Sequence, residues 1–141
     1  MVNGNSNGFD VVSHPCMSIE ENSEKGTLLE FRDPHGKKLG CNAIVYGMDS
    51  RRYSEVMEEV ADYRELHSDS NGEFTLTPKH TRAIAVIMAS GLIKSWSGFH
   101  ASGEPLEFNR ENAENLFSRA HFFAEQVVEH SRERGNYYSA S

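Results

Sequence analysis

Hydrophobic and polar positions alternate with a period of two from residue 28 to residue 46, and this alternation predicts a β-hairpin. The positions expected to share one apolar face are Leu29, Phe31, Cys41, Ala43 and Val45. Asp33-Pro34-His35-Gly36 separates the strands with the chemistry of a turn, because Pro fixes φ at the second position and Gly tolerates a left-handed conformation at the fourth. A two-stranded hairpin is not stable alone in water, so this face must pack on helices or on another subunit.

Three segments with helical periodicity follow the hairpin and predict helices over about 50–66, 78–96 and 110–134. The first has an apolar stripe from Tyr53 to Tyr63 and a charged opposite face, which we interpret as solvated. The second is apolar nearly all round from Ala83 to Ile93, which is typical of a helix central to a small core or covered by another chain. The third carries the clearest single stripe.

These elements predict an α+β fold in which an N-terminal β-hairpin precedes a bundle of three main α-helices. We expect a single domain over residues 27–141, preceded by an arm over residues 1–26. The arm is rich in Asn, Ser, Gly and Glu, and its few apolar residues are too scattered to define a helix face. This composition indicates either a disordered terminus or an arm that orders on a partner.

Charge and hydropathy exclude several classes of partner. The net charge of -7 argues against nucleic-acid binding, which depends on clustered Lys and Arg. The longest apolar run, around residues 83–93, is far shorter than a membrane-spanning helix, and no apolar segment follows a basic start, so we expect a soluble protein that is not secreted. Of the two cysteines, one lies in the arm and one in a strand, which does not favour a disulfide.

The sequence predicts neither a catalytic site nor a metal or cofactor site. Its glycines form no phosphate-binding loop, and its seven histidines include no pair at the spacing of a zinc-binding helix. His14-Pro15-Cys16 lacks a second ligand pair downstream, and the loop from His67 to Gly72 lacks the alternating acids of a calcium site. We therefore expect a protein that is not an enzyme.

The stretch from Trp96 to Asn109 joins the two most apolar helical segments and contains the only tryptophan. Together with segments before and after it, this stretch resembles the small tail assembly chaperones of tailed bacteriophages. The matching C-terminal elements are Trp96-Ser97-Gly98, Gly103-Glu104-Pro105-Leu106-Glu107-Phe108-Asn109, Glu111-Asn112, Gln126 and Asn136-Tyr137. The matching N-terminal elements are Phe31-Arg32-Asp33-Pro34-His35-Gly36, Gly40 and Asp49-Ser50. The resemblance spans residues 28–138, and Asn109-Arg110 replaces the usual Thr-Pro of the family while keeping a capping residue.

The resemblance implies a non-enzymatic helper in the cytoplasm of the infected host. Proteins of this family bind the hydrophobic tape measure protein, keep it soluble and deliver it to the tail tube protein. The alternative is a structural component of the tail or head-tail region that stays in the virion. Self-association through the hairpin edge or the apolar helix is a further expectation.

Five aromatic side chains are the residues that we expect to contact a partner. They are Trp96, Phe99, Phe122, Tyr137 and Tyr138. Two interpretations stay open for Trp96, which either plugs the core with its indole bonded to a loop carbonyl or serves as a partner hot spot. Phe99 and Phe122 likewise belong either to the core or to a partner contact. The two C-terminal tyrosines either pack back on the core or form an exposed anchor.

Overall fold

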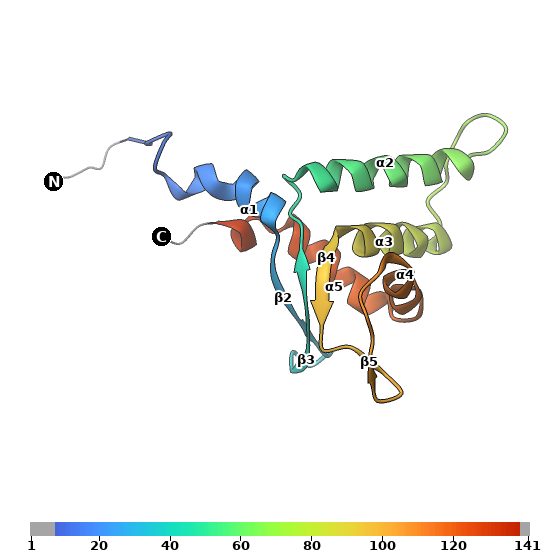
Figure 1. Ribbon diagram of the computed structural model, residues 1–141. Helices are drawn as coiled ribbons and strands as arrows, with labels where there is room; N and C mark the ends of the chain where they lie inside the picture. Colours follow the sequence, from blue (N-terminus) through green and yellow to red (C-terminus); the bar gives the residue numbers. More distant parts are fainter. Residues whose placement is uncertain (1–7, 139–141) are drawn as a thin grey trace.

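The computed structural model of the protein describes residues 8–138 and confirms the α+β class. The chain runs from an N-terminal helical segment through a sheet into a group of helices (Figure 1). Its elements are η1 (Pro15–Ser18), α1 (Ile19–Lys25), β2 (Thr27–Arg32), β3 (Lys38–Val45), α2 (Arg51–Leu66), α3 (Pro78–Leu92), β4 (Ile93–Ser97), β5 (His100–Ala101), β6 (Glu104–Pro105), α4 (Arg110–Arg119), α5 (His121–Arg132) and η2 (Arg134–Tyr137).

The predicted hairpin is confirmed as β2 and β3, which pair antiparallel. Its turn is stabilised by the Asp33 carboxylate, whose Oδ1 accepts hydrogen bonds from the backbone N–H of His35 at 2.8 Å and of Lys37 at 3.0 Å. Gly36 adopts φ +84°, the left-handed conformation that the turn requires. Four of the five residues of the predicted apolar face are buried, and Phe31 and Ala43 have no exposed surface, while Leu29 is half-buried.

The second predicted helix, over 78–96, is too long by four residues. Helix α3 ends at Leu92, and the next five residues form β4, which pairs with the free edge of β3 and completes a three-stranded sheet in the order β2-β3-β4. Trp96 lies opposite Ala43 in this pairing. The edge of β3 therefore provides hydrogen-bond partners that a local helical pattern does not reveal.

The third predicted helix, over 110–134, is two helices in the structure. Ala120 has φ -134° and ψ 77°, which breaks the helix between α4 and α5. Both helices contact α3, so the apolar stripe continues across the break and the periodicity gives no sign of it. As predicted, Asn109 caps the first of them, and its Oδ1 accepts a hydrogen bond from Asn112 N–H at 2.8 Å.

Helix α3 is the centre of the helical group, as its apolar sequence predicts. It contacts α2, α4 and α5, and its C-terminal half is buried. Helix α5 also packs on β2 and β3, and lies behind the sheet in Figure 1. Helices therefore cover one face of the sheet, while Leu28 on β2 points away from this core and is 52% exposed.

The interpretation of residues 1–26 as an arm without a helix is wrong for its second half. Helix α1 docks on the domain, where Asn22 Nδ2 donates to the backbone carbonyl of Tyr137 at 2.9 Å and the carbonyl of Ser23 accepts from Gly47 N–H at 3.1 Å. The Glu24 carboxylate accepts a hydrogen bond from Arg51 N–H at 2.9 Å, at the first turn of α2. Residues 1–7 of the predicted arm and residues 139–141 of the predicted domain lie outside the described residues.

Candidate functional site

A groove with a volume of about 480 Å³ runs between α2 and α5, with α3 at its base. Both flanking helices pack against α3, which sets the separation of the two walls. Its lining residues are Met57, Val60, Arg64, Leu76, Thr81, Ile84, Ala85, Met88, His121, Glu125, Val128, Glu129 and Arg132. The groove is therefore bounded by two helices along its length and by the loop before α3 at one end.

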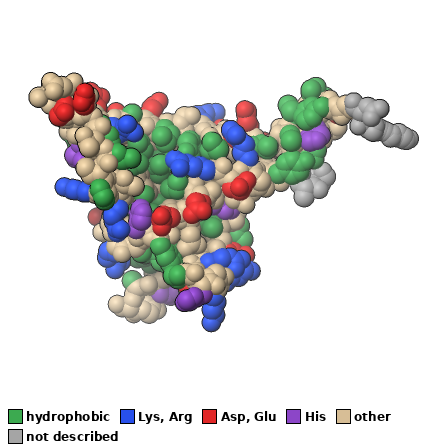
Figure 2. Space-filling model, turned by 180° about the vertical axis from the view of Figure 1, so that it is seen from behind, with side chains coloured by type: hydrophobic (Ala, Val, Ile, Leu, Met, Phe, Trp, Pro, Cys, Tyr) green, Lys and Arg blue, Asp and Glu red, His purple; other side chains and the backbone are tan. Residues whose placement is uncertain are grey.

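The groove is apolar at its base and open to solvent above. Val60 and Met88 are buried, whereas Met57 is 37% exposed and Leu76 is 61% exposed. Figure 2 shows this face of the molecule, where hydrophobic side chains gather between the two helices and a row of acidic side chains borders them. Exposed apolar side chains grouped in a concave surface are typical of a protein-binding site.

The two arginines that line the groove are engaged within the protein. Arg132 donates from Nε to the Tyr53 hydroxyl at 3.2 Å and contacts the sulfur of Met88 at 3.9 Å. The guanidinium of Arg64 stacks over the ring of Phe74, 4.8 Å from the ring centroid. These contacts hold both cations against the protein surface.

The two glutamates that line the groove have weaker partners. The Glu125 carboxylate lies 3.8 Å from His121 Nε2, beyond hydrogen-bond distance, and its side chain is 58% exposed. Glu129 has no ion pair with any residue between 8 and 138. The α5 wall therefore presents two acidic groups that are free to bind an external cation.

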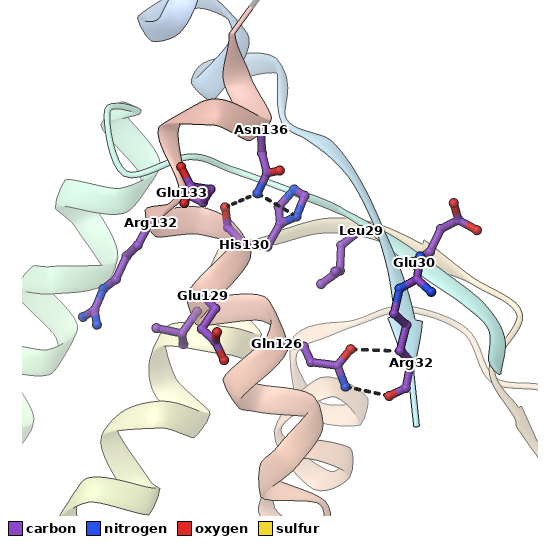
Figure 3. Close-up of a pocket in the computed structure, with 10 residues that line it drawn as sticks. Leu29, Glu30, Arg32, Gln126, Glu129, His130, Arg132, Glu133 and Asn136 are labelled. Atoms are coloured by element: carbon purple, nitrogen blue, oxygen red, sulfur yellow. Dashed lines mark hydrogen bonds between the residues drawn. The ribbon is translucent and has the colours of Figure 1, made fainter. Parts of the chain in front are cut away.

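A second, more polar cleft of about 510 Å³ lies between β2 and α5 (Figure 3). Gln126 crosses it and bonds to the backbone of Arg32 with both ends of its amide. Its Nε2 donates to the Arg32 carbonyl and its Oε1 accepts from Arg32 N–H, each at 2.9 Å. This side chain occupies the outer edge of β2, so the hairpin edge is already paired at Arg32.

His130 on α5 closes the other end of this cleft. Its Nε2 lies 2.8 Å from Thr27 Oγ1, and its Nδ1 lies 3.2 Å from Asn136 Nδ2, an atom that also donates to the His130 carbonyl at 3.1 Å. Burial lowers the pKa of His130, which favours the neutral imidazole. Since Nδ1 accepts from the Asn136 amide, the proton of the neutral ring sits on Nε2 and is donated to Thr27.

The structure places two of the predicted partner-binding residues in an aromatic cluster beside the sheet. Trp96 is half-buried, its Nε1 donates to the Leu106 carbonyl at 2.9 Å, and its ring packs on Phe99 and Phe108 at centroid distances of 4.7 and 5.2 Å. Phe99 also packs edge-on against the buried ring of Phe31 at 5.4 Å. This geometry favours the core-plug interpretation of Trp96, with its indole bonded to a loop carbonyl.

The other three predicted residues differ in how deeply they are buried. Phe122 is half-buried against Phe123, with centroids 4.8 Å apart. Tyr137 is 1% exposed and donates its hydroxyl to the Val45 carbonyl at 2.9 Å, and its burial raises its pKa to about 12. Tyr138 is 45% exposed and remains available to a partner.

None of the five predicted aromatic residues lines the groove between α2 and α5. The residues that sequence reasoning missed include Met57 and Leu76, the two groove residues that belong to the exposed large hydrophobic side chains of the described residues. One signal was present, because the apolar stripe of α2 is wider than its buried face, where Val56 and Val60 alone are buried. An apolar stripe wider than the buried face indicates that the helix has apolar surface left for a second contact.

Within residues 8–138, no group of three or more His, Cys, Asp or Glu side chains could hold a metal ion. The same part of the chain contains no helix that is long and apolar enough to cross a membrane. Both cysteines are free, and burial raises the pKa of the Cys41 thiol. The chain matches no protein-family model, no curated protein and no solved structure.

Proposed function

We propose that the protein is a tail assembly chaperone of a tailed bacteriophage. In the host cytoplasm it binds the tape measure protein, keeps it soluble and releases it to the tail tube protein as the tube assembles. The observation that carries the proposal is the open apolar groove between α2 and α5, taken together with the sequence resemblance. No catalytic step is part of this function.

The groove has the dimensions to receive a short helical segment. Its α5 wall spans 12 residues, which corresponds to a length of about 18 Å and about three turns of a bound helix. Met57, which is 37% exposed, contributes a flexible, polarisable side chain that adapts to different apolar sequences. A chaperone for a long hydrophobic protein needs this tolerance, because it must cover many segments of different sequence.

Co-expression with the tape measure protein of the same genome is the direct test. We expect the tape measure protein to become soluble and to co-purify with the chaperone. The double substitution Met57→Gln/Leu76→Gln should reduce the recovered complex by about tenfold or more, because burial of one such side chain contributes about 1.5–3 kcal/mol.

The control is the double substitution Leu28→Gln/Leu39→Gln on the hairpin, where the leucines are 52% and 43% exposed. These exposures are similar to those of the groove residues, but the hairpin leucines lie outside the groove. We expect this variant to hold the tape measure protein as the wild type does. An equally insoluble tape measure protein with no recovered complex would contradict the proposed function.

A structural role in the virion is the second candidate, and the exposed apolar residues of the N-terminal segment favour it. Phe9, Val11, Val12 and Met17 are 53%, 66%, 88% and 53% exposed, and hydrophobic side chains gather on this projection in Figure 2. Such residues suit a segment that laces one subunit to its neighbours. Mass spectrometry of purified particles separates the candidates, because a structural component is stoichiometric in the virion and a chaperone is absent or strongly substoichiometric.

A further inference from the structure

We infer that the helix bound in the groove between α2 and α5 carries basic residues beside its apolar stripe, on the side that faces α5. This inference rests on the proposed function and names the chemistry of the partner at the same groove. It follows from the distribution of engaged and free charges along the two walls.

The α5 wall carries a pair of like charges that form no close ion pair within the described residues. Glu125 and Glu129 are four residues apart on one helix, so their side chains are neighbours on the same face, where like charges are destabilising. The Glu125 carboxylate lies 3.8 Å from the imidazole Nε2 of His121, and Glu129 has no ion pair within residues 8–138. A Lys or Arg side chain from a partner would relieve this repulsion.

The two arginines of the groove are held by neutral groups of the protein and not by the two glutamates. Arg132 is bonded to the Tyr53 hydroxyl and contacts Met88, and Arg64 stacks on Phe74. Neither guanidinium forms an ion pair with Glu125 or Glu129 among the described residues. Of the charged residues of α5 that line the groove, Glu125 and Glu129 are negative and Arg132 alone is positive, so this wall presents a net negative charge to a partner.

The charge of the whole chain acts in the same direction. A net charge of -7 attracts basic segments and repels acidic ones before contact is made. Complementary charges at the rim of an interface mainly control specificity and the rate of association, while the apolar base supplies affinity. The fitting occupant is thus an amphipathic helix with apolar residues at i, i+3, i+4 and i+7 and with Lys or Arg flanking that stripe.

The test uses three synthetic helical peptides of about 18 residues, a length of about 27 Å that spans the groove. All three share one Leu/Ile stripe, and the flanking positions carry Lys, Gln or Glu. Binding is measured by fluorescence anisotropy at low salt and again at about 0.5 M salt, where exposed charges are screened. The proteins compared are the wild type, Glu125→Gln/Glu129→Gln and the control Glu104→Gln/Glu107→Gln. The control also removes two negative charges, but from exposed positions outside the groove.

We expect the wild type to bind the Lys-flanked peptide about 5- to 30-fold more tightly than the Glu-flanked one at low salt. The preference should fall below about twofold in Glu125→Gln/Glu129→Gln and at high salt, and it should persist at low salt in the control. Equal binding of the Lys- and Glu-flanked peptides to the wild type would overturn the inference. So would a preference that survives the removal of both groove glutamates.

Failure of all three peptides to bind would also overturn the inference, because the groove would then not be a helix site. The proposed function is decided separately by recovery of the tape measure protein on co-expression. A soluble complex that resists Met57→Gln/Leu76→Gln would keep the chaperone function and place its binding surface elsewhere.

Discussion

The side-chain amide of Gln126 pairs with the backbone of Arg32 as a neighbouring β-strand would, through two hydrogen bonds of 2.9 Å. Because Gln126 lies on α5, this contact fixes the helix to the edge of the sheet and occupies backbone groups that could otherwise pair with another chain. An edge strand protected in this way is a poor template for self-association.

Replacement of Gln126 with Leu should therefore have two effects. We expect a loss of about 1–3 kcal/mol in the free energy of unfolding, since both backbone groups of Arg32 lose their partner. We also expect concentration-dependent dimers through the uncovered edge of β2, measured by sedimentation velocity. Ser118→Leu, which adds an exposed leucine to α4 at a residue with no side-chain hydrogen bond, is the control and should remain unchanged in assembly state. A Gln126→Leu variant that unfolds and sediments like the wild type would contradict the edge-protection role.

Trp96 supports a second prediction, which separates packing from partner binding. Trp96→Ala should lower the free energy of unfolding by about 2–4 kcal/mol. This is less than the value of about 3–5 kcal/mol that is typical of a fully buried aromatic ring, because Trp96 is half-buried. Trp96→Phe keeps an aromatic ring but loses the bond to the Leu106 carbonyl, and should cost about 1 kcal/mol. Urea unfolding followed by circular dichroism measures both values, since the variants lack tryptophan fluorescence. A Trp96→Ala variant that is fully stable but fails to bind the tape measure protein would restore the hot-spot interpretation.

The hairpin was predictable from sequence because its information is local. Alternation set the two faces, and Asp33 with Gly36 specified the turn between them. The capped starts of α2, α3 and α4 were predictable for the same reason, since each cap bonds to a backbone N–H only three residues ahead. Helix α1 also had local signals, with acidic residues in its first turn and Gly26 at its end, and these were overlooked among the polar residues of the arm.

The structural features that sequence reasoning missed depend on contacts between distant parts of the chain. Strand β4 exists because β3 has a free edge, which no window around Trp96 can reveal. The charged face of α2 was interpreted as solvated, yet Arg52 donates to the Gly91 carbonyl at 2.9 Å and Glu59 accepts from Arg110 at 2.8 Å, so the two residues tie α2 to α3 and α4. The groove likewise requires three helices to be brought together before its lining residues become neighbours.

His130 leads to a prediction for the pH dependence of stability. An unfolded imidazole titrates near pH 6.5, whereas burial lowers the pKa of His130 in the folded protein. Below pH 6.5 the unfolded chain therefore binds the proton more readily than the folded protein does. The contribution of the neutral, buried ring is fully present above about pH 6.5 and is lost as the pH falls through the lower, folded-state pKa.

We expect the urea midpoint of the wild type, followed by tryptophan fluorescence, to fall between pH 7 and pH 5 by more than that of His130→Gln. The glutamine can still bond to Thr27 but does not titrate. His35→Gln is the control, because His35 is exposed in the hairpin turn, and its pH profile should match that of the wild type. Equal pH profiles for His130→Gln and the wild type would show that His130 does not control acid sensitivity.

Gly91 sets how closely α3 approaches α2, and its role gives the last prediction. A methyl group added at Gly91 would lie 2.7 Å from Cγ2 of the fully buried Val56, too close for undisturbed packing. Gly91→Ala should gain about 1 kcal/mol in helix propensity but lose about 1–3 kcal/mol in overpacking, so we expect a net loss of stability of up to about 2 kcal/mol.

Removal of the opposing methyl groups should compensate this strain. In Gly91→Ala/Val56→Ala the new methyl occupies space vacated by the valine, so the double variant should be more stable than the sum of the single effects predicts, by about 1–2 kcal/mol. Val60, one turn further along α2, is not among the nearest neighbours of a methyl group at Gly91, so the cycle of Gly91→Ala with Val60→Ala should be additive within about 0.5 kcal/mol. Urea unfolding of the variants in both cycles measures the two coupling energies. Additivity in the Val56 cycle would show that α2 shifts to accept the methyl group, and that Gly91 does not determine the spacing of the two helices that support the groove.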